Sequence, residues 1–299
     1  MLIREAIAQG SADLKYADIK SPGLDASILL AHILKTNRTS LVAAGNEKLS
    51  EKNCAAFCEL IERRCNGECV AYIIGKKEFR NLDFSVNKSV LVPRPDTETL
   101  VEAAIEIINR LDKNETQINV LDLCTGSGAV AISLKNECPD LEIFATDICA
   151  NALEVAKQNA KNLLGDNQIK FFLGDLFNAL NCSNLCASVP PCENLPNNFS
   201  MIVSNPPYIP SGEIQTLSAE VQNEPRLALD GGKDGLEIIG RIIKEAPKYL
   251  RSKGYLLLEA SPEQMENISI LLEKNGFIDI KLYKDLSGSE RVIGGMFEK

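Results

Sequence analysis

The run Asn205-Pro206-Pro207-Tyr208 is the stretch of this sequence best suited to chemistry on a flat amino group. Proline has no N–H to donate to a sheet, and a residue before proline is pushed toward extended geometry. We therefore expect a stiff loop that holds the Asn205 amide and the neighbouring carbonyls in place. Such a loop offers two acceptors for an N–H₂ group, with the Tyr208 ring beside them. Asn and Pro also favour ordinary turns, so the run alone leaves a simple strand-ending turn open.

A second group of polar residues follows the other predicted strands. The turn 124–128 (Cys124, Thr125, Gly126, Ser127, Gly128) comes directly after an apolar strand that carries Asp122 near its end. Asp147 ends the second strand and Asp175 the third, with Leu176 next to it. Glycines in such a turn permit close approach of the backbone to a ligand. Asp147 lies about 20 residues beyond the turn, where a carboxylate can hold ribose hydroxyls.

The ligand that fits these residues is S-adenosylmethionine. The turn lacks the Gly-x-Gly-x-x-Gly spacing of a dinucleotide site. Asp122 is unsuited to a pyrophosphate but suits a cationic ligand that carries an amino acid. Asp175 can accept a hydrogen bond from an adenine amino group, and we expect Leu176 to join the same pocket. The two glycines would otherwise mark only a tight turn between strand and helix.

From residue 118 onward, apolar strand-like segments alternate with helical patterns. This alternation predicts an α/β fold with a mostly parallel, doubly wound sheet. The last two strands follow each other without a helix, so we expect the last one to be antiparallel. If the strand order reverses at the fourth strand, Asn205 lies beside the first strand's turn, where ligands bind. The seven predicted strands are 118–123, 141–147, 169–173, 199–204, 255–259, 277–283 and 291–297.

The part of the chain before this pattern has a different character. Residues 1–75 read as a small helical domain for recognition or docking, with Ser50 as the N-cap of its third helix. Residues 76–92 are predicted to form a β-hairpin linker, with 70–75 as a further strand-like segment. Residues 93–299 are expected to form the domain that binds S-adenosylmethionine, in which Asp96 or Thr97 would cap the first helix. Arg94, between two prolines, is either a fixed cation at the site or a surface arginine in a linker.

Composition limits the function classes. The chain has 299 residues and a net charge of −9, which argues against a large nucleic-acid footprint. No apolar run is long enough to span a membrane, and the first residues lack the pattern of a signal peptide, so we expect a cytoplasmic protein. His32, the single histidine, lies among apolar residues and is expected to be buried or half-buried. Catalysis by a histidine-dependent triad is thereby excluded.

Ten cysteines do not indicate disulfides in a chain of this size and kind. Cys124 and Cys149 are expected to be free and buried in core segments. Metal binding is not favoured, because structural zinc sites commonly use a two-residue spacing between cysteines and no histidine is near. The groups that could otherwise hold a metal are Cys54 with Cys58, Cys65 with Cys69, and Cys182, Cys186 and Cys192 in a polar loop.

The sequence resembles the release-factor glutamine methyltransferases (HemK/PrmC type), within the class I S-adenosylmethionine-dependent methyltransferases. The resemblance covers nearly the whole chain. Asn-Pro-Pro-Tyr alone is shared with enzymes that methylate nucleic-acid bases, and the combination of motifs makes the match specific. The matching segments are 91–98 (Leu-Val-Pro-Arg-Pro-Asp-Thr-Glu), 122–128, 204–209, 224–229, 231–236 and the closing 285–292.

The resemblance implies a Rossmann-like sheet of seven strands and methyl transfer to the amide nitrogen of a glutamine in the Gly-Gly-Gln motif of peptide-chain release factors. In that reading Asp147 holds the ribose, Asp175 the adenine and the turn 125–128 the methionine part. Asn205 and the Pro206 carbonyl accept the two amide N–H bonds, and Tyr208 packs on the amide. Arg94 and Pro207 complete the substrate contacts.

Two departures from the family pattern are Cys124, where a glycine is common, and an apparent insertion at 181–198. Two other functions stay open at this point. One is methylation of a nucleic-acid base, such as adenine N6 or guanine N2, which should need a basic groove and aromatic residues. The other is a binding protein that keeps the fold without catalysis.

Overall fold

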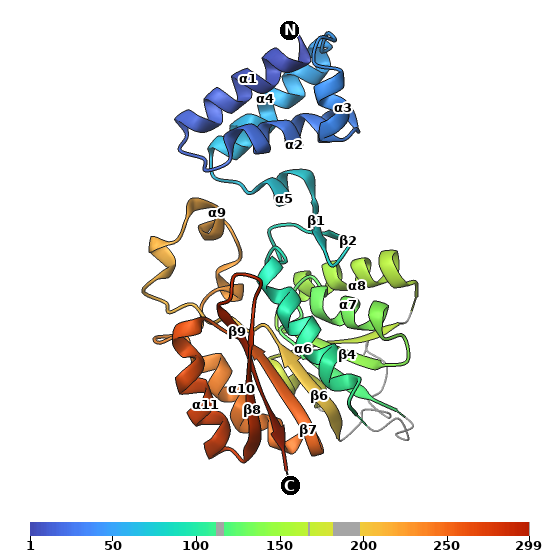
Figure 1. The fold of residues 1–299 in the computed structure, drawn as a ribbon, viewed down its shortest axis with the longest axis vertical. Helices are drawn as coiled ribbons and strands as arrows, with labels where there is room; N and C mark the ends of the chain where they lie inside the picture. Colours follow the sequence, from blue (N-terminus) through green and yellow to red (C-terminus); the bar gives the residue numbers. More distant parts are fainter. Residues whose placement is uncertain (112–116, 167, 182–197, 299) are drawn as a thin grey trace. The chain divides into compact units, whose positions relative to one another are not determined.

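The protein folds into two compact units in the computed structural model, which describes residues 1–111, 117–166, 168–181 and 198–298 (Figure 1). The first unit comprises Met1–Lys76 and Leu217–Asn223, and the second comprises Lys77–Thr216 and Glu224–Lys299. The chain thus leaves the second unit once, after Thr216, and returns to it at Glu224. Within the described residues no helix is both long and apolar enough to cross a membrane.

The first unit is a bundle of helices around one apolar core. The core residues recur at helical spacing, as in Ile3, Ala6, Gly10 and Leu14 of α1. Ser50 caps α4 as expected, because its hydroxyl accepts a hydrogen bond from the Asn53 N–H at 3.2 Å. The helices are α1 (Ile3–Tyr16), α2 (Pro22–Leu34), α3 (Arg38–Ala43), α4 (Glu51–Cys65), α5 (Val70–Ile74) and the short α9 (Ala219–Gln222).

Two expectations for this unit are wrong. Val70–Ile74 forms helix α5 rather than a strand-like segment. A short apolar run is compatible with both structures, and Gly75, with φ 75°, ends the helix in the left-handed conformation. His32 is exposed instead of buried, because it lies on the outer face of α2, away from Leu29 and Leu30.

A buried cation holds the parts of the first unit together. Arg64, whose side chain is 3% exposed, donates from Nε to Asp25 at 2.8 Å and pairs through Nη2 with Glu220. Its Nη1 donates to the Glu68 carbonyl at 3.2 Å. Asn223 donates to the Gly67 carbonyl at 3.1 Å. These bonds attach Leu217–Asn223 to the helical bundle, although the neighbouring residues on both sides belong to the second unit.

The second unit begins with a hairpin, β1 (Lys76–Phe79) and β2 (Leu82–Ser85), as expected for the linker. A 3₁₀ turn, η1 (Pro95–Thr97), then leads into α6 (Glu98–Ile108). The expectation that Asp96 or Thr97 caps this helix is wrong. Thr97 has helical backbone angles and its side chain makes no capping bond within the described chain, while Asp96 pairs with Arg291 at 3.3 Å.

A seven-stranded sheet forms the centre of this unit, in the order β5-β4-β3-β6-β7-β9-β8. All neighbours are parallel except the pairs made by β9, so the last strand is antiparallel as expected. The order reverses between β3 and β6, which confirms the expected switch point. The strands are β3 (Asn119–Leu123), β4 (Glu142–Asp147), β5 (Ile169–Leu173), β6 (Phe199–Ser204), β7 (Leu250–Glu259), β8 (Phe277–Lys284) and β9 (Glu290–Phe297).

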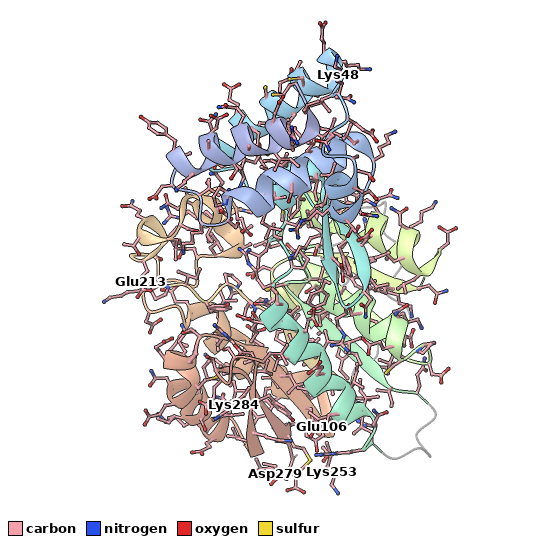
Figure 2. All side chains as sticks on the ribbon, turned by 45° about the horizontal axis from the view of Figure 1, so that its top comes forward. Lys48, Glu106, Glu213, Lys253, Asp279 and Lys284 are labelled. Carbon is pink, nitrogen blue, oxygen red and sulfur yellow. The ribbon has the colours of Figure 1, made fainter. Side chains whose placement is uncertain are left out.

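Helices cover both faces of the sheet, as its apolar strands require (Figure 1). One core joins the sheet to α6, α7 (Ala129–Glu137) and α8 (Ala150–Leu164). The other joins it to η2 (Leu176–Leu180), α10 (Glu237–Glu245) and α11 (Met265–Lys274). The edge strand β8 carries an irregularity at Asp279, whose φ is 51° (Figure 2). Such a bulge at a sheet edge hinders pairing with another chain.

The buried Arg64 leads to a test of the helical unit. Arg64→Met should lower the free energy of unfolding by about 3–5 kcal/mol, because it leaves the Asp25 carboxylate buried without its cation. The neighbouring Arg63 pairs with Glu68 from a side chain that is 43% exposed, so Arg63→Met should cost at most about 1 kcal/mol. Urea unfolding of the full chain, with hydrogen exchange in α2 and α4, measures both. Equal effects of the two variants would contradict this account.

Candidate active site

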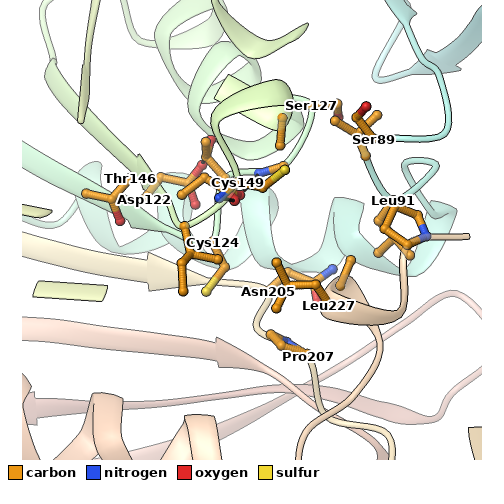
Figure 3. Close-up of a pocket in the computed structure, with 18 of the residues that line it drawn as sticks. Ser89, Leu91, Asp122, Cys124, Ser127, Thr146, Cys149, Asn205, Pro207 and Leu227 are labelled. Carbon is orange, nitrogen blue, oxygen red and sulfur yellow. Dashed lines mark hydrogen bonds between the residues drawn. The ribbon is translucent and has the colours of Figure 1, made fainter. Parts of the chain in front are cut away.

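A cavity of about 440 Å³ opens at the carboxyl ends of β3, β4, β5 and β6 (Figure 3). The strand order places it there, since Leu123 of β3 pairs with Ser204 of β6 and the two chain reversals are adjacent. Most of the residues expected at the site line this cavity. They are Arg94, Asp122, Cys124, Thr125, Gly126, Ser127, Asp147, Asp175, Leu176, Asn205 and Pro207. Three expected residues, Gly128, Pro206 and Tyr208, lie outside its lining.

The turn after β3 has the backbone geometry of a ligand-binding loop. Gly126 and Gly128 have φ of 55° and 83°, where glycine is favoured. A Cβ at Gly128 would approach the Ile132 side chain to 2.8 Å, whereas at Gly126 it would meet nothing within 4 Å. Gly128 thus serves the close packing of turn and helix. Cys124 also has a positive φ, 60°, a conformation that glycine adopts more readily.

Asp147 is held by the loops on both sides of it. Its two oxygens accept hydrogen bonds from the Gly126 N–H at 2.9 Å and from the Cys149 N–H at 2.8 Å. Burial raises the pKa of Asp147, and the bonds from backbone N–H groups oppose that rise. Each carboxylate oxygen can accept more than one hydrogen bond, so the group can still take hydroxyls from a ligand.

Asp175 follows the end of β5, the strand next to β4, and the Gly174 N–H before it donates to the Asp147 carbonyl at 2.9 Å. Asp175 pairs with Arg241 of α10, which donates from Nη2 at 2.5 Å. Leu176, next to it, has φ 50°. Ile148, the residue after Asp147, also lines the cavity. Its apolar side chain is 52% exposed. An exposed apolar side chain beside two carboxylates suits the face of a base whose edge and sugar are polar.

Asp122 lies beneath the turn and is 1% exposed. It accepts a hydrogen bond from the Thr125 hydroxyl at 2.6 Å. Burial raises the pKa of Asp122 to about 7, and the bond from Thr125 opposes that rise. A buried acid with this pKa gains from a nearby cation, because the cation favours its charged form.

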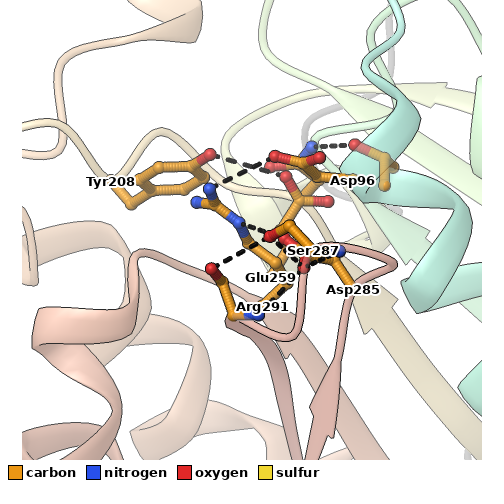
Figure 4. Close-up of polar contacts among 9 residues, drawn as sticks. Asp96, Tyr208, Glu259, Asp285, Ser287 and Arg291 are labelled. Carbon is orange, nitrogen blue, oxygen red and sulfur yellow. Dashed lines mark hydrogen bonds and ion pairs between the residues drawn. The ribbon is translucent and has the colours of Figure 1, made fainter.

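Asn205 extends from the end of β6 into the cavity (Figure 3). Its Nδ2 donates to the Thr97 hydroxyl oxygen at 3.1 Å. The Tyr208 ring packs partly against the core, and its hydroxyl donates to Oε1 of Glu259 at 3.5 Å (Figure 4). Glu259 ends β7, is 1% exposed, and also has a side-chain hydrogen bond with Thr97. Burial raises the pKa of Glu259 to about 7.

Arg94 reaches the cavity but is not free. Its Nη2 pairs with Glu224, which also accepts a hydrogen bond from the Val92 N–H at 3.1 Å. Glu224 begins the segment that carries Leu227, an exposed apolar residue of the cavity rim. The pair therefore fixes the loop before α6 to the loop before α10.

Sequence reasoning did not identify Thr97 as a partner of Asn205, nor Glu259, Arg241 and Ile148. Ile148 had a local signal, because it follows the acid that ends β4. The other three reach the site only through the fold.

The cysteines of the described segments are free, namely Cys54, Cys58, Cys65, Cys69, Cys124, Cys138 and Cys149. Cys124 and Cys149 line the cavity and are only half-buried, which corrects the expectation of core positions. Burial raises the pKa of the Cys124 thiol, so it stays protonated. In the described part of the chain no group of three His, Cys, Asp or Glu side chains could hold a metal. Cys182, Cys186, Cys192 and nearly all of the apparent insertion lie outside the described residues.

Known proteins share both parts of this architecture. The family model of the PrmC N-terminal domain matches residues 5–75, and that of the methyltransferase small domain matches residues 101–222. Among solved structures, a human methyltransferase 10 domain containing protein superposes with a TM-score of 0.53 at 16% identity, over 73% of this chain and 90% of that one. The hMettl16 catalytic domain, solved with an RNA hairpin, gives 0.56 at 15% identity, over 81% and 83%. These two likenesses show the fold alone.

Fold and site define an S-adenosylmethionine-dependent methyltransferase. Curated relatives specify the family. The release factor glutamine methyltransferase of Buchnera aphidicola subsp. Baizongia pistaciae is 38% identical over 94% of this chain and 97% of the relative. That of Rhodopirellula baltica is 38% identical over 92% and 89%, and that of Haemophilus influenzae 33% identical over 100% of both. The chain belongs to the release factor glutamine methyltransferase family.

The residues present fit S-adenosylmethionine. Asp147 and Asp175 offer acceptors for ribose and adenine groups, and Ile148 and Leu176 offer apolar surface. Asp122, below the glycine turn, would supply a negative charge to the positively charged groups of the ligand, which favour its ionised form. The cavity volume of about 440 Å³ falls within the usual range for small-molecule sites.

A binding experiment tests the assignment of Asp147. Asp147→Asn should weaken S-adenosylmethionine binding by roughly 10-fold to 100-fold, since it removes a charged acceptor and disturbs two backbone bonds. Calorimetry on the purified chain measures the dissociation constant. Asp166→Asn, on an exposed turn after α8, is the control and should bind as wild type. Unchanged affinity in Asp147→Asn would refute the assignment.

The buried carboxyls predict an unusual pH dependence of stability. Asp122 and Glu259 have ordinary pKa values of 3.8 and 4.5 and folded values of about 7. Both therefore bind protons more tightly in the folded state, so the ligand-free protein should lose stability as pH rises from about 4 to above 7. Glu259→Gln removes one of the two groups. It should flatten this dependence and raise the free energy of unfolding at pH 8 by on the order of 2 kcal/mol.

Urea unfolding between pH 5 and pH 8 measures this effect. Glu273→Gln, an exposed carboxylate of α11, is the matched control and should change stability by less than about 0.5 kcal/mol. A Glu259→Gln protein that is less stable than wild type at pH 8 would show that the buried carboxylate stabilises the fold.

Proposed function

We propose that this chain transfers the methyl group of S-adenosylmethionine to the side-chain amide nitrogen of a glutamine in peptide-chain release factors, in their Gly-Gly-Gln motif. The observation that carries the proposal is the position of Asn205 within the cavity, in a chain 38% identical to a release factor glutamine methyltransferase over 94% of its length. The enzyme acts where release factors act, in the cytoplasm.

The proposed reaction depends on the orientation of the glutamine amide more than on a catalytic base. S-adenosylmethionine, when bound, supplies an electrophilic methyl group. A glutamine amide nitrogen is a weak nucleophile because its lone pair is delocalised. Asn205 accepts one amide N–H and the Pro206 carbonyl accepts the other, so that the lone pair points at the methyl group. The N–C bond would form as the S–C bond breaks, and the nitrogen would then lose one of its two protons to solvent. Holding the reactants in line in this way can supply a large part of the rate enhancement.

The other predicted substrate residues complete this arrangement. Pro207 forms cavity wall beside Asn205, and Arg94 is held at the rim by Glu224. Tyr208 lies outside the cavity lining and supports the loop through its ring, which packs against the core, and its hydroxyl, which donates to Glu259. The helical unit, residues 1–75 in the proposed domain division, recognises the release factor outside the glutamine motif. The hairpin of residues 76–92 links it to the catalytic domain.

Asn205→Ala should reduce methyl transfer by about 100-fold or more, because the amide nitrogen is no longer held in line. The dissociation constant for S-adenosylmethionine should change by no more than about threefold. Transfer of a radiolabelled methyl group to a purified release factor measures the first quantity, and calorimetry measures the second. Asn162→Ala, an exposed asparagine of α8, is the matched control and should be fully active.

Three substrates in the same assay separate the candidate functions. Label should enter the release factor and be absent from its Gln→Ala variant and from DNA or RNA. Label in nucleic acid but not in the release factor would overturn the proposal, and so would full activity of Asn205→Ala.

A further inference from the structure

Asn205, Thr97 and Glu259 form a chain of hydrogen bonds, of which only Asn205 has a role in the proposed reaction. Asn205 Nδ2 and Thr97 Oγ1 are 3.1 Å apart, and Thr97 also bonds to Glu259. Thr97 is 4% exposed and Glu259 is 1% exposed. The stability of the fold explains neither residue, because Thr97 does not cap α6 and burial disfavours the charged form of Glu259.

The direction of these bonds follows from the donors available. A hydroxyl has one hydrogen to donate, and an ionised carboxylate can only accept. When Glu259 is ionised, the Thr97 hydrogen therefore goes to Glu259, and the Thr97 oxygen is left as an acceptor. Only the N–H₂ side of the Asn205 amide can satisfy that acceptor. The carbonyl oxygen of the same amide is then left for another partner, and Asn205 lines the cavity.

We propose that Thr97 and Glu259 are positioning residues that orient the Asn205 amide so that its oxygen, and not its nitrogen, faces the substrate. This inference rests on the proposed function, because an oxygen is what the N–H₂ group of a glutamine needs as a partner. A flipped amide would present N–H groups to the substrate N–H₂ and repel it. Thr97 thus selects the productive one of two nearly isosteric orientations.

The second oxygen of Glu259 supports this role. Glu259 Oε2 is buried and has no hydrogen-bond partner among the described residues. A carboxylate kept for structure alone would be expected to have both oxygens satisfied, since an unsatisfied buried oxygen is costly. The charged groups that face Glu259 are Asp96 from η1 and Arg291 from β9, with the Tyr208 hydroxyl from the loop after β6 (Figure 4).

A pair of substitutions at Thr97 separates orientation from packing. Thr97→Val keeps the shape and removes the hydroxyl, so kcat for methylation of the release factor should fall by about 10-fold to 100-fold. Thr97→Ser keeps the hydroxyl and should stay within about threefold of wild type. Both should bind S-adenosylmethionine within about twofold of wild type. Thr99→Val, a buried threonine two residues further along in α6, controls for the substitution itself and should keep full activity.

Glu259→Gln tests the other end of the chain. A glutamine can donate to Thr97, which frees the Thr97 hydrogen for the Asn205 oxygen and favours the flipped amide. We expect kcat to fall by a similar factor. At saturating S-adenosylmethionine, wild-type kcat/KM for the release factor should decline as pH falls below about 7, the pKa of Glu259, and this decline should be absent in Glu259→Gln.

The outcomes are decisive in both directions. Loss in Thr97→Val with recovery in Thr97→Ser, together with the missing acid limb in Glu259→Gln, supports the inference. Equal losses in Thr97→Val and Thr97→Ser would reduce Thr97 to a packing residue. Wild-type kinetics in Thr97→Val or in Glu259→Gln would also overturn the inference. Failure of the wild-type protein to label a release factor would instead refute the proposed function.

Discussion

The active site depends on the parallel pairing of β3 with β6. These strands are distant in the sequence, yet Leu123 and Ser204 pair at their carboxyl ends, and the Ser204 hydroxyl donates to the Leu123 carbonyl at 2.7 Å. The pairing sets the glycine turn after β3 beside Asn205 after β6. Cofactor and substrate groups meet only because the strand order reverses there.

Local rules were enough to find the residues on either side of this reversal. Apolar runs ending in Asp147 and Asp175 indicate buried parallel strands, and two prolines after Ser204 stop a strand unambiguously. The order of strands and helices then constrains the topology to a few arrangements. For this reason the sheet, its antiparallel last strand and eleven of the residues that line the cavity could be predicted from the sequence. Side-chain identity and backbone preference agree at these positions.

The remaining residues could not be predicted because their roles contradict their local preferences. Thr97 precedes a helix and is therefore an expected N-cap. Its hydroxyl instead accepts a hydrogen bond from Asn205, 108 residues away in the sequence. Arg241 and Glu259 lie in ordinary helical and strand patterns. Nothing local distinguishes Leu217–Asn223 from a loop of the second unit. Its place in the first unit follows from long-range bonds, those of Arg64 to Glu220 and of Asn223 to Gly67. Long-range hydrogen bonds and ion pairs have no period along a sequence.

Residues whose conformation or burial is unfavourable for folding are concentrated at the site, and each of them costs free energy of folding. Cys124 and Leu176 have positive φ although neither is glycine, and both line the cavity. Asp122 and Glu259 are carboxyls whose burial raises the pKa and disfavours the charge that each would carry during function. Each feature opposes folding by on the order of 1–3 kcal/mol. Of these residues Cys124, Leu176 and Asp122 line the cavity, so a cationic ligand that favours the charged form of Asp122 would relieve part of what the fold alone leaves unfavourable.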